Sequence, residues 1–257
     1  MQKKPICICL LFAALLAALT ACGAGKPAVL TAGDVTEQNL AQVCEVLSGA
    51  GLSNVDVFEQ WVRSSLSDSS DEGSSGFSDA DCRMTVMLLA GDRIAYDSVE
   101  ETYDGDYLMF DVDAIENNAE YSVLRDKERL FTTMFGEMPI PEGGFADALS
   151  ETWNKHGIRV DSDRFSVISI LFKAYGQEEA FVGHTGILID CRDNDSVGSD
   201  YLFLEKIAFG DPFRITPVDD EQALLKVFSE RPDYSVEDGA PAPVVCRNGE
   251  RIGELTP

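Results

Sequence analysis

The chain has 257 residues and a formal net charge of −25 at pH 7. This acidity argues against a nucleic-acid partner, because the phosphate backbone repels a polyanion. The length is enough for one large domain or two small ones.

The first 21 residues have the pattern of a secretory signal peptide. Lys3 and Lys4 precede the uncharged run 6–19, which is shorter than the roughly 20 residues that a membrane-spanning helix needs. An uncleaved anchor helix is the alternative. The sequence Leu19-Thr20-Ala21-Cys22 resembles the lipobox of bacterial lipoproteins. That resemblance implies cleavage before Cys22, lipidation of its thiol, and anchoring to the extracytoplasmic face of the cell membrane by two acyl chains.

Four cysteines follow residues 22–33, which we interpret as a lipidated tether. Their spacing shows neither a CxxC pair nor a zinc-ligand set, and two disulfides outside the cytosol stay possible. We expect no cofactor and no metal. The acidic segments 104–106, 111–116 and 193–200 are loose candidates for calcium, but we favour solvated turns. The four cysteines are Cys44, Cys82, Cys191 and Cys246.

The front half of the chain is predicted to be helical. Apolar residues at helical spacing indicate helices after Thr36 and after Asn54, in which Cys44 and Trp61 are expected to be buried. A loop rich in Ser, Asp and Gly spans 67–78, and Ser78 or Asp79 is expected to cap a third helix over 81–90. Further helical patterns cover 113–118, 122–135 and 145–156, the last ending at Gly157.

The back half has the composition of β-strands. Strands are predicted over 164–175, 180–190 and 201–209, with a short turn at 176–178 between the first two. Asp219 is expected to cap a helix over 221–230, and Asn248-Gly249 indicates a hairpin turn. Helices followed by antiparallel strands predict an α+β fold, in which residues 34–257 form a single domain with N-terminal helices packed on a C-terminal sheet.

Three residues form a candidate catalytic set. Cys82 falls in the first turn of the third helix, where the helix dipole and Arg83 favour a thiolate, against Asp79 and Asp81. His184 lies in an apolar strand beside Gly183 and Gly186, and Glu205 lies in the next strand, within possible hydrogen-bonding reach of His184. The alternative is that Cys82 and His184 are buried core residues with no chemistry. His156, at a helix end beside Lys155, is interpreted as structural.

The order of a helix-start cysteine, a strand histidine and a polar residue on the next strand resembles that of papain-like cysteine peptidases. In those enzymes the thiolate attacks a carbonyl, the imidazole moves the proton, and helix-start N–H groups hold the oxyanion. The resemblance is one of order and element type. The chain has Arg83-Met84 where peptidases that cut peptidoglycan stem peptides have Ser-Gly, and no glutamine is evident for the oxyanion hole.

Five segments together resemble another family over most of the chain. They are Cys82-Arg83-Met84-Thr85, Phe110-Asp111 with 114–118, Trp153 with Gly157-Ile158, 183–188 and 203–209. The family is the domain of unknown function 4300 family of surface lipoproteins from Gram-positive bacteria. The resemblance implies a surface location and places Cys82, His184 and Glu205 in well-marked segments.

Two functions remain open from the sequence. The first is a thiol hydrolase or transferase that acts on peptide-like amides, such as a peptide or cell-wall substrate, through Cys82 and His184. The second is a non-enzymatic surface lipoprotein that binds a peptide, glycan or ion.

Overall fold

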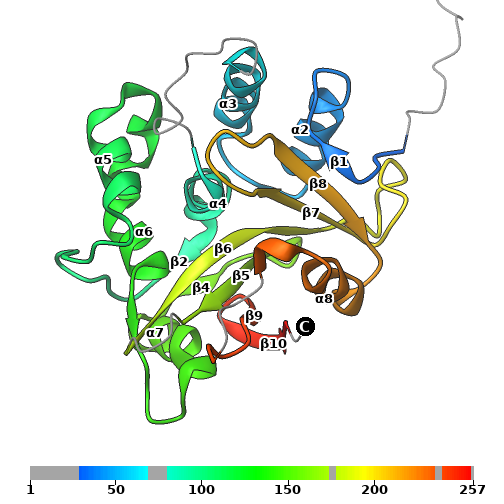
Figure 1. The fold of residues 1–257 in the computed structure, drawn as a ribbon. Helices are drawn as coiled ribbons and strands as arrows, with labels where there is room; N and C mark the ends of the chain where they lie inside the picture. The colour runs from blue at the N-terminus through cyan, green and yellow to red at the C-terminus, as the bar shows by residue number, and fades with distance from the viewer. Residues whose placement is uncertain (1–28, 69–79, 174–177, 235–238, 256–257) are drawn as a thin grey trace, which may run out of the picture.

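A computed structural model describes residues 29–68, 80–173, 178–234 and 239–255 (Figure 1). The predicted signal peptide, Cys22 and most of the tether lie outside the described residues. So do most of the polar loop over 67–78 and part of the predicted turn over 176–178.

The fold is α+β and is built on one large antiparallel sheet. The strands pair in the order β1-β8-β7-β6-β5-β9-β10, and β3 pairs with one end of β6. Two further strands, β2 and β4, form a small separate ladder. The strands are β1 Gly33–Asp34, β2 Ile94–Ala95, β3 Met138–Pro139, β4 Arg159–Val160, β5 Phe165–Phe172, β6 Glu179–Asp190, β7 Tyr201–Lys206, β8 Phe213–Val218, β9 Val244–Arg247 and β10 Glu250–Glu254.

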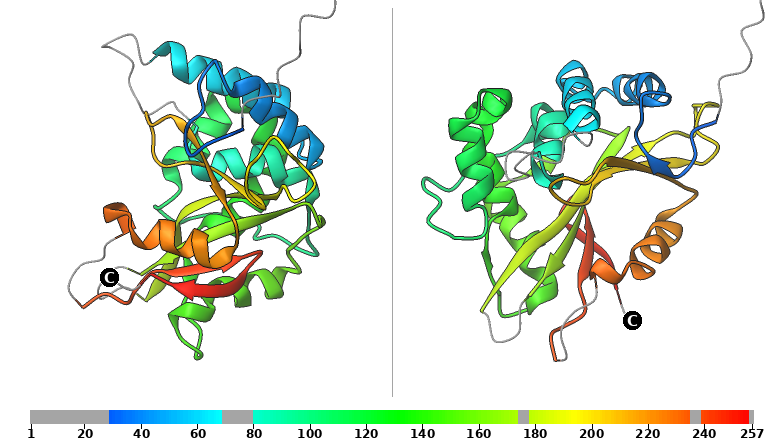
Figure 2. Two further views of the ribbon diagram at one scale, coloured as in Figure 1. Left: turned by 90° about the vertical axis from the view of Figure 1, so that its right-hand side faces the viewer. Right: turned by 45° about the horizontal axis from the view of Figure 1, so that its top comes forward.

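The sheet divides the helices into two layers. Those from the front half gather on one side of the sheet, and α8 lies on the opposite side (Figures 1 and 2). The helices are α2 Leu40–Gly49, α3 Val55–Asp68, α4 Cys82–Ala90, α5 Met109–Asn117, α6 Glu128–Phe135, α7 Ala148–His156 and α8 Glu221–Ser229. Short 3₁₀ helices are η1 Gly91–Arg93, η2 Ala119–Lys127, η3 Phe145–Asp147 and η4 Pro232–Tyr234.

Each face of the sheet buries its own apolar core, because side chains alternate between the two faces of a strand. On β5, Val167 and Leu171 pack toward the front-half helices, whereas Ile168 and Ile170 pack toward α8. Both faces are therefore covered, which explains why the central strands are apolar almost throughout.

Helix and strand boundaries differ from the sequence predictions mainly at their ends. Asn39, not Thr36, precedes α2, and Asp220, not Asp219, caps α8 through its side chain. The segment predicted as one helix over 122–135 is the 3₁₀ helix η2 followed by α6. Cys44 is half-buried rather than buried, while Trp61 is buried as predicted.

The predicted hairpin turn is confirmed. Asn248 and Gly249 both have positive φ, at 50° and 86°, and they join β9 to β10. Asparagine and glycine tolerate this backbone best, which is why the pair predicts the turn.

Candidate active site

Helix α4 begins at Cys82 because Asp81 caps it. Oδ1 of Asp81 accepts a hydrogen bond from the Met84 N–H at 2.8 Å, and its carbonyl accepts from the Thr85 N–H. A cap of this kind satisfies amide groups that have no partner within the helix. Cys82 is thus the first helical residue, at the positive end of the helix dipole, and it exposes 4% of its surface.

One edge of β6 pairs with β5. On its other edge, the start of α4 lies against a stretch that neither β3 nor β7 covers. Along this edge β6 pairs with β3 at Glu179 and Ala180, and with β7 only from Gly186 onward. Between these ladders, Arg83 Nη1 donates to the Val182 carbonyl at 3.3 Å. The uncovered backbone of β6 therefore binds the helix, and this contact brings Cys82 beside the strand that carries His184.

A β-bulge at Gly183 sets the direction of His184. His184 pairs with Ile170 and Val182 pairs with Leu171, so Gly183 is the extra residue on β6. A Cβ at Gly183 would overlap the ring of Phe172. Bulges of this kind redirect a side chain, and glycine is required here because of the close approach.

The His184 ring links Cys82 to Glu205. Its Nε2 lies 2.8 Å from Oε2 of Glu205, and the ring interacts with the Cys82 side chain closely enough for Cys82 to raise its pKa. Because Nε2 is engaged by the carboxylate, Nδ1 is the ring nitrogen left for the sulfur. The three residues predicted from the sequence are thus brought together in the predicted order.

Charged neighbours set the ionisation of this buried set. Burial alone would lower the pKa of His184, but the hydrogen bonds to Cys82 and Glu205 outweigh it and raise that pKa to about 9. Burial alone would raise the pKa of Glu205, yet His184 and Arg231 hold it below its usual value. His184 is therefore an imidazolium and Glu205 a carboxylate at neutral pH.

Two residues of the site were not predicted from the sequence. Arg231, just after α8, holds both oxygens of Glu205, with Nη1 at 2.7 Å from Oε2 and Nη2 at 2.5 Å from Oε1. Tyr234 in η4 hydrogen-bonds Arg231, and its ring centre lies 5.6 Å from that of His184. The one available signal was the carboxylate of Glu205 within an apolar strand, which requires a buried cation.

A second buried charged cluster lies beneath the start of α4. Arg83 Nη2 is 2.6 Å from Oδ2 of Asp81 and 3.2 Å from Oδ2 of Asp111, and Nη1 is 3.1 Å from the Tyr107 hydroxyl. The charge of Arg83 is therefore shared with two carboxyl groups. The sequence assigned Arg83 to the thiolate alone and missed Asp111 as its partner.

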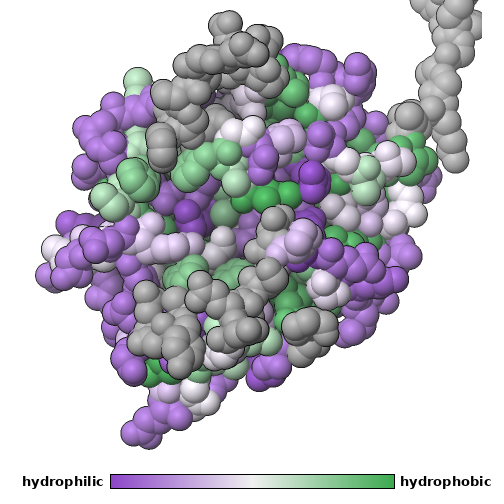
Figure 3. Space-filling model, viewed as in Figure 1, coloured by the Kyte–Doolittle hydropathy of each residue, from purple (hydrophilic) through white to green (hydrophobic). Residues whose placement is uncertain are grey.

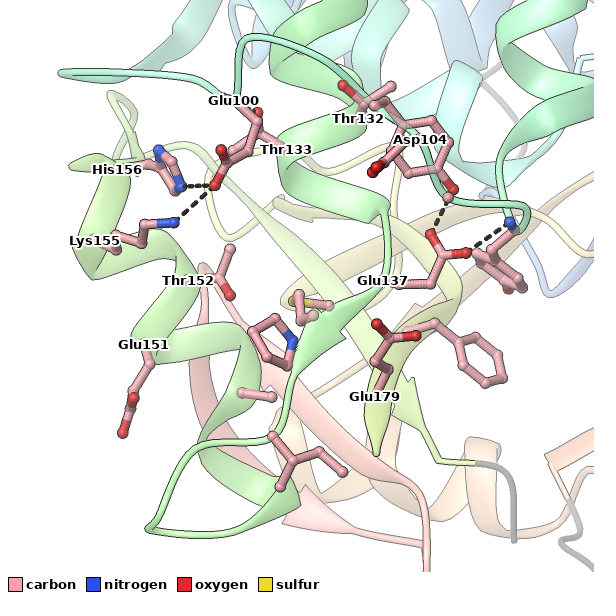
Figure 4. Close-up of a pocket in the computed structure, with 18 of the residues that line it drawn as sticks. Glu100, Asp104, Thr132, Thr133, Glu137, Glu151, Thr152, Lys155, His156 and Glu179 are labelled. Atoms are coloured by element: carbon pink, nitrogen blue, oxygen red, sulfur yellow. Dashed lines mark hydrogen bonds and ion pairs between the residues drawn. The ribbon is translucent and has the colours of Figure 1, made fainter. Parts of the chain in front are cut away.

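A hollow in the described surface lies apart from Cys82. It has a volume of about 1110 Å³, and its wall includes Tyr107 and Phe181 but neither Cys82 nor His184. Figure 4 shows Glu100 bound to Lys155 and His156 on one side of the hollow, with Glu137 and Glu179 on the other. His156 is buried and hydrogen-bonded to Ser98 and Glu100, as suits the structural role predicted for it.

The structure also bears on the cysteines, the acidic segments and the question of a membrane-spanning helix. Cys44, Cys82, Cys191 and Cys246 are free thiols. Within the described ranges, no group of three or more His, Cys, Asp or Glu side chains could hold a metal ion, and the loosely acidic segments do not converge. Among the described helices, none has the length and apolarity needed to cross a membrane.

A comparison with protein families adds the wider context. The sequence pattern of a family described as a domain of unknown function (DUF4300) matches residues 46–252. The chain belongs to this family. The matched range contains Cys82, His184, Glu205 and Arg231, so the family resemblance seen in the sequence is confirmed. Among curated proteins and solved structures, nothing matches the chain.

Proposed function

We propose that this DUF4300 protein is a lipid-anchored extracytoplasmic thiol hydrolase or transferase that acts on peptide-like amides. The observation that carries the proposal is the chain of contacts from the Cys82 thiol through His184 to Glu205 and Arg231. A nucleophile, a base that touches it and a group that orients the base are the parts of a papain-like catalytic set.

The charges of the site favour an ion pair between sulfur and imidazole. With His184 and Arg231 positive and Glu205 negative, the buried set carries one net positive charge. Buried charge is costly unless it is compensated. A thiolate at Cys82 supplies the compensating charge, because it lies at the helix start and against the ring.

The proposed reaction follows from these positions. The Cys82 sulfur attacks the amide carbonyl carbon, and in this proposal the first-turn N–H groups of Cys82 and Arg83 hold the oxyanion. His184 gives its proton to the leaving amine as the C–N bond breaks. The resulting thioester is then cleaved by water, which His184 deprotonates, or by an acceptor amine in a transferase.

Access to the sulfur is the most demanding requirement of this proposal. Cys82 exposes 4% of its surface and His184 exposes 2%, so a substrate must displace neighbouring atoms to reach them. Reagents of different size test this point. With each rate divided by that of the same reagent with a small free thiol, iodoacetamide is expected to favour Cys82 much more than a bulky maleimide does, and equal ratios would contradict a narrow approach.

The direct test is turnover of peptide and cell-wall fragments by the full chain in detergent. We expect new amines to be released, and this release to be lost in Cys82→Ala and in His184→Gln. Cys191→Ala is the matched control, because Cys191 is an equally buried free thiol outside the site. Turnover that survives in Cys82→Ala would disprove the proposal.

The hollow in Figure 4 supports a second candidate, a binding lipoprotein without catalysis. Its volume of about 1110 Å³ is at the upper end of the range for ligand pockets. Carboxylates outnumber cations on its wall, which suits a peptide that bears amino groups. Under this candidate, peptide binding measured by calorimetry is unchanged in Cys82→Ala and weakened in Glu137→Gln.

A further inference from the structure

Asp81 and Asp111 lie beneath Cys82, and each has one buried side-chain oxygen for which the described residues supply no hydrogen-bond donor. Oδ2 of Asp81 and Oδ1 of Asp111 are shielded from solvent and accept no hydrogen bond from any donor among the described residues. Arg83 reaches Oδ2 of Asp81 only as an ion pair of unsuitable angle, and reaches the other oxygen of Asp111. A buried carboxylate oxygen without a hydrogen-bond donor is strongly unfavourable. Two such oxygens, on residues that contact the same arginine, therefore require an explanation.

A single proton shared by the two carboxyl groups would give both of these oxygens a hydrogen-bond partner. The two carboxyl groups lie side by side, because Oδ2 of Asp81 and Oδ2 of Asp111 contact the same nitrogen of Arg83, at 2.6 Å and 3.2 Å. If Asp111 carries a proton on Oδ1, that oxygen becomes a donor and Oδ2 of Asp81 becomes its acceptor. Neighbouring carboxyl groups commonly share a proton because the second ionisation would place like charges in contact.

We propose that Asp111 is protonated, that it donates a hydrogen bond to Asp81, and that it thereby acts as a positioning residue for the Cys82 thiol. This inference rests on the proposed function for its role at Cys82, whereas the shared proton stands on the geometry alone. Asp81 caps α4, and the helix begins at Cys82, so a fixed Asp81 side chain fixes the backbone that carries the sulfur.

The charge balance of the cluster gives the same result. With one proton shared, Asp81 and Arg83 cancel and the cluster is neutral. With both carboxyl groups ionised it carries a negative charge next to Cys82, which opposes a thiolate. Burial, followed by the charge of Asp81, raises the pKa of Asp111 to about 8, while Arg83 opposes this rise.

The other groups around the pair do not supply the missing proton. The titratable or charged groups in contact with the cluster are Arg83, its neighbour Cys82, and Tyr107 from the segment before α5. Burial raises the pKa of Tyr107 to about 12, and its hydroxyl is directed to Arg83 and the Val182 carbonyl. His184 is hydrogen-bonded to Glu205 and interacts with Cys82.

Replacing Asp111 with asparagine tests the shared proton, because the amide is a permanent donor of nearly the same shape. Unfolded Asp111 ionises near its ordinary pKa of 3.8, whereas the folded group keeps its proton to about 8. Its stabilising contribution is therefore complete below about pH 4 and is lost as the pH rises to about 8. The melting temperature of Asp111→Asn should rise relative to the wild type across this window and level off above it.

Two variants serve as controls. Asp113→Asn makes the same chemical change at an exposed position of α5, and its melting temperature should keep a constant offset from the wild type. Asp111→Ala leaves Oδ2 of Asp81 without a donor and should melt at a lower temperature than Asp111→Asn at every pH. The shared proton would be overturned if the difference in melting temperature between Asp111→Asn and the wild type did not change with pH. It would also be overturned if Asp111→Asn melted at as low a temperature as Asp111→Ala.

Infrared spectroscopy of the wild-type chain gives a test that does not depend on variant folding. A protonated carboxyl stretch should be present at about pH 6 and vanish above about pH 9, with no counterpart in Asp111→Asn. Absence of the band in the wild type overturns the proposal.

Alkylation of Cys82 tests the positioning role separately. In the wild type, ionisation of Asp111 should slow the rise of the iodoacetamide rate near pH 8, and Asp111→Asn should lack this inflection. Identical profiles would overturn the positioning role. If Cys82 is inert in every variant while the infrared band is present, the proposed function fails and the shared proton stands.

Discussion

The imidazole of His184 is the residue on which the proposed chemistry depends. It exposes 2% of its surface, contacts a thiol and a carboxylate, and has a pKa raised to about 9. A buried cation persists only when its partners compensate for the lost water. Glu205 provides this compensation on one side, and we propose that the Cys82 thiolate provides it on the other.

The pH dependence of stability should report this raised pKa. The contribution of His184 to the free energy of unfolding is complete below about pH 6.5 and is lost as the pH rises to about 9. A shift of this size corresponds to about 3 kcal/mol. Urea denaturation of the wild type and His184→Gln should show the wild-type advantage shrinking across this window. A difference that is constant or grows would contradict the assignment.

The pair formed by Glu205 and Arg231 should be costly to break on one side. In Glu205→Gln the Arg231 side chain, which is 12% exposed, loses the carboxylate that it binds, and we expect a loss of about 3–5 kcal/mol in the free energy of unfolding. Glu254→Gln breaks an exposed pair with Arg251 and should cost at most about 1 kcal/mol. If urea denaturation gives similar losses of unfolding free energy for both variants, the buried pair contributes no more to stability than the exposed one.

The bulge in β6 and the start of α4 together create the site. β6 is central in the sheet, yet its residues between the β3 and β7 ladders contact a helix start in place of a strand. The bulge at Gly183 directs His184 to this place, and Glu205 on β7 is the partner of Gly186. Two local irregularities of regular elements thus bring thiol, ring and carboxylate together.

Replacing Gly183 with alanine should disturb both packing and reactivity. The new Cβ would overlap the Phe172 ring, which costs about 1–3 kcal/mol by overpacking and displaces His184. Gly49→Ala in α2 meets nothing within 4 Å and is the matched control. The melting temperature and the alkylation rate of Cys82 should both fall in Gly183→Ala, and neither should fall in Gly49→Ala. A variant that melts like the wild type would show that the bulge tolerates a side chain.

Elements with strong local signals could be predicted from the sequence, and those defined by distant contacts could not. Cys82 at a helix start, the long strands β5 and β6 and the Asn248-Gly249 turn follow from spacing and turn chemistry. Strand β8 was missed because it is short and contains Pro217. The site residues Cys82, His184 and Glu205 were identified because each is an exception within its element.

The partners of those exceptions carry no such signal. Arg231 follows the end of α8, where a basic residue usually interacts with the helix dipole and solvent. Asp111 lies in an acidic segment that resembles a solvated turn, yet it is 2% exposed and bound to Arg83. Only the packing of segments far apart in sequence shows that both are buried partners of a charged group.

At the level of the whole molecule, an acidic exterior surrounds a charge-balanced interior. Hydrophilic residues dominate the outer margin of the face in Figure 3, and hydrophobic atoms show mainly toward its middle. The formal charge of the chain is −25, whereas the buried carboxyl groups of Asp81, Asp111 and Glu205 each have an arginine partner. The acidity therefore suits solubility on a crowded surface and plays no part in the site.

Lipid anchoring at Cys22 is a separate prediction about the whole protein. Expressed in bacteria, the wild-type chain should partition into the detergent phase and carry a lipid on its N-terminal peptide, as measured by mass spectrometry. Cys22→Ser has no thiol to lipidate, so its N-terminal peptide should carry no lipid. A wild-type chain that keeps residues 1–21 and carries no lipid on Cys22 would instead support the uncleaved anchor helix.

The most direct test of the central claim is the rate at which iodoacetamide alkylates each thiol between about pH 5 and 9, mapped by peptide mass spectrometry. Burial raises the pKa of Cys44 and Cys191 to about 11 and that of Cys246 to about 12, so these thiols should react slowly. We predict that Cys82 reacts at least tenfold faster than they do near neutral pH, and that His184→Gln removes this advantage. A Cys82 that reacts no faster than Cys191, with or without His184, would contradict the account.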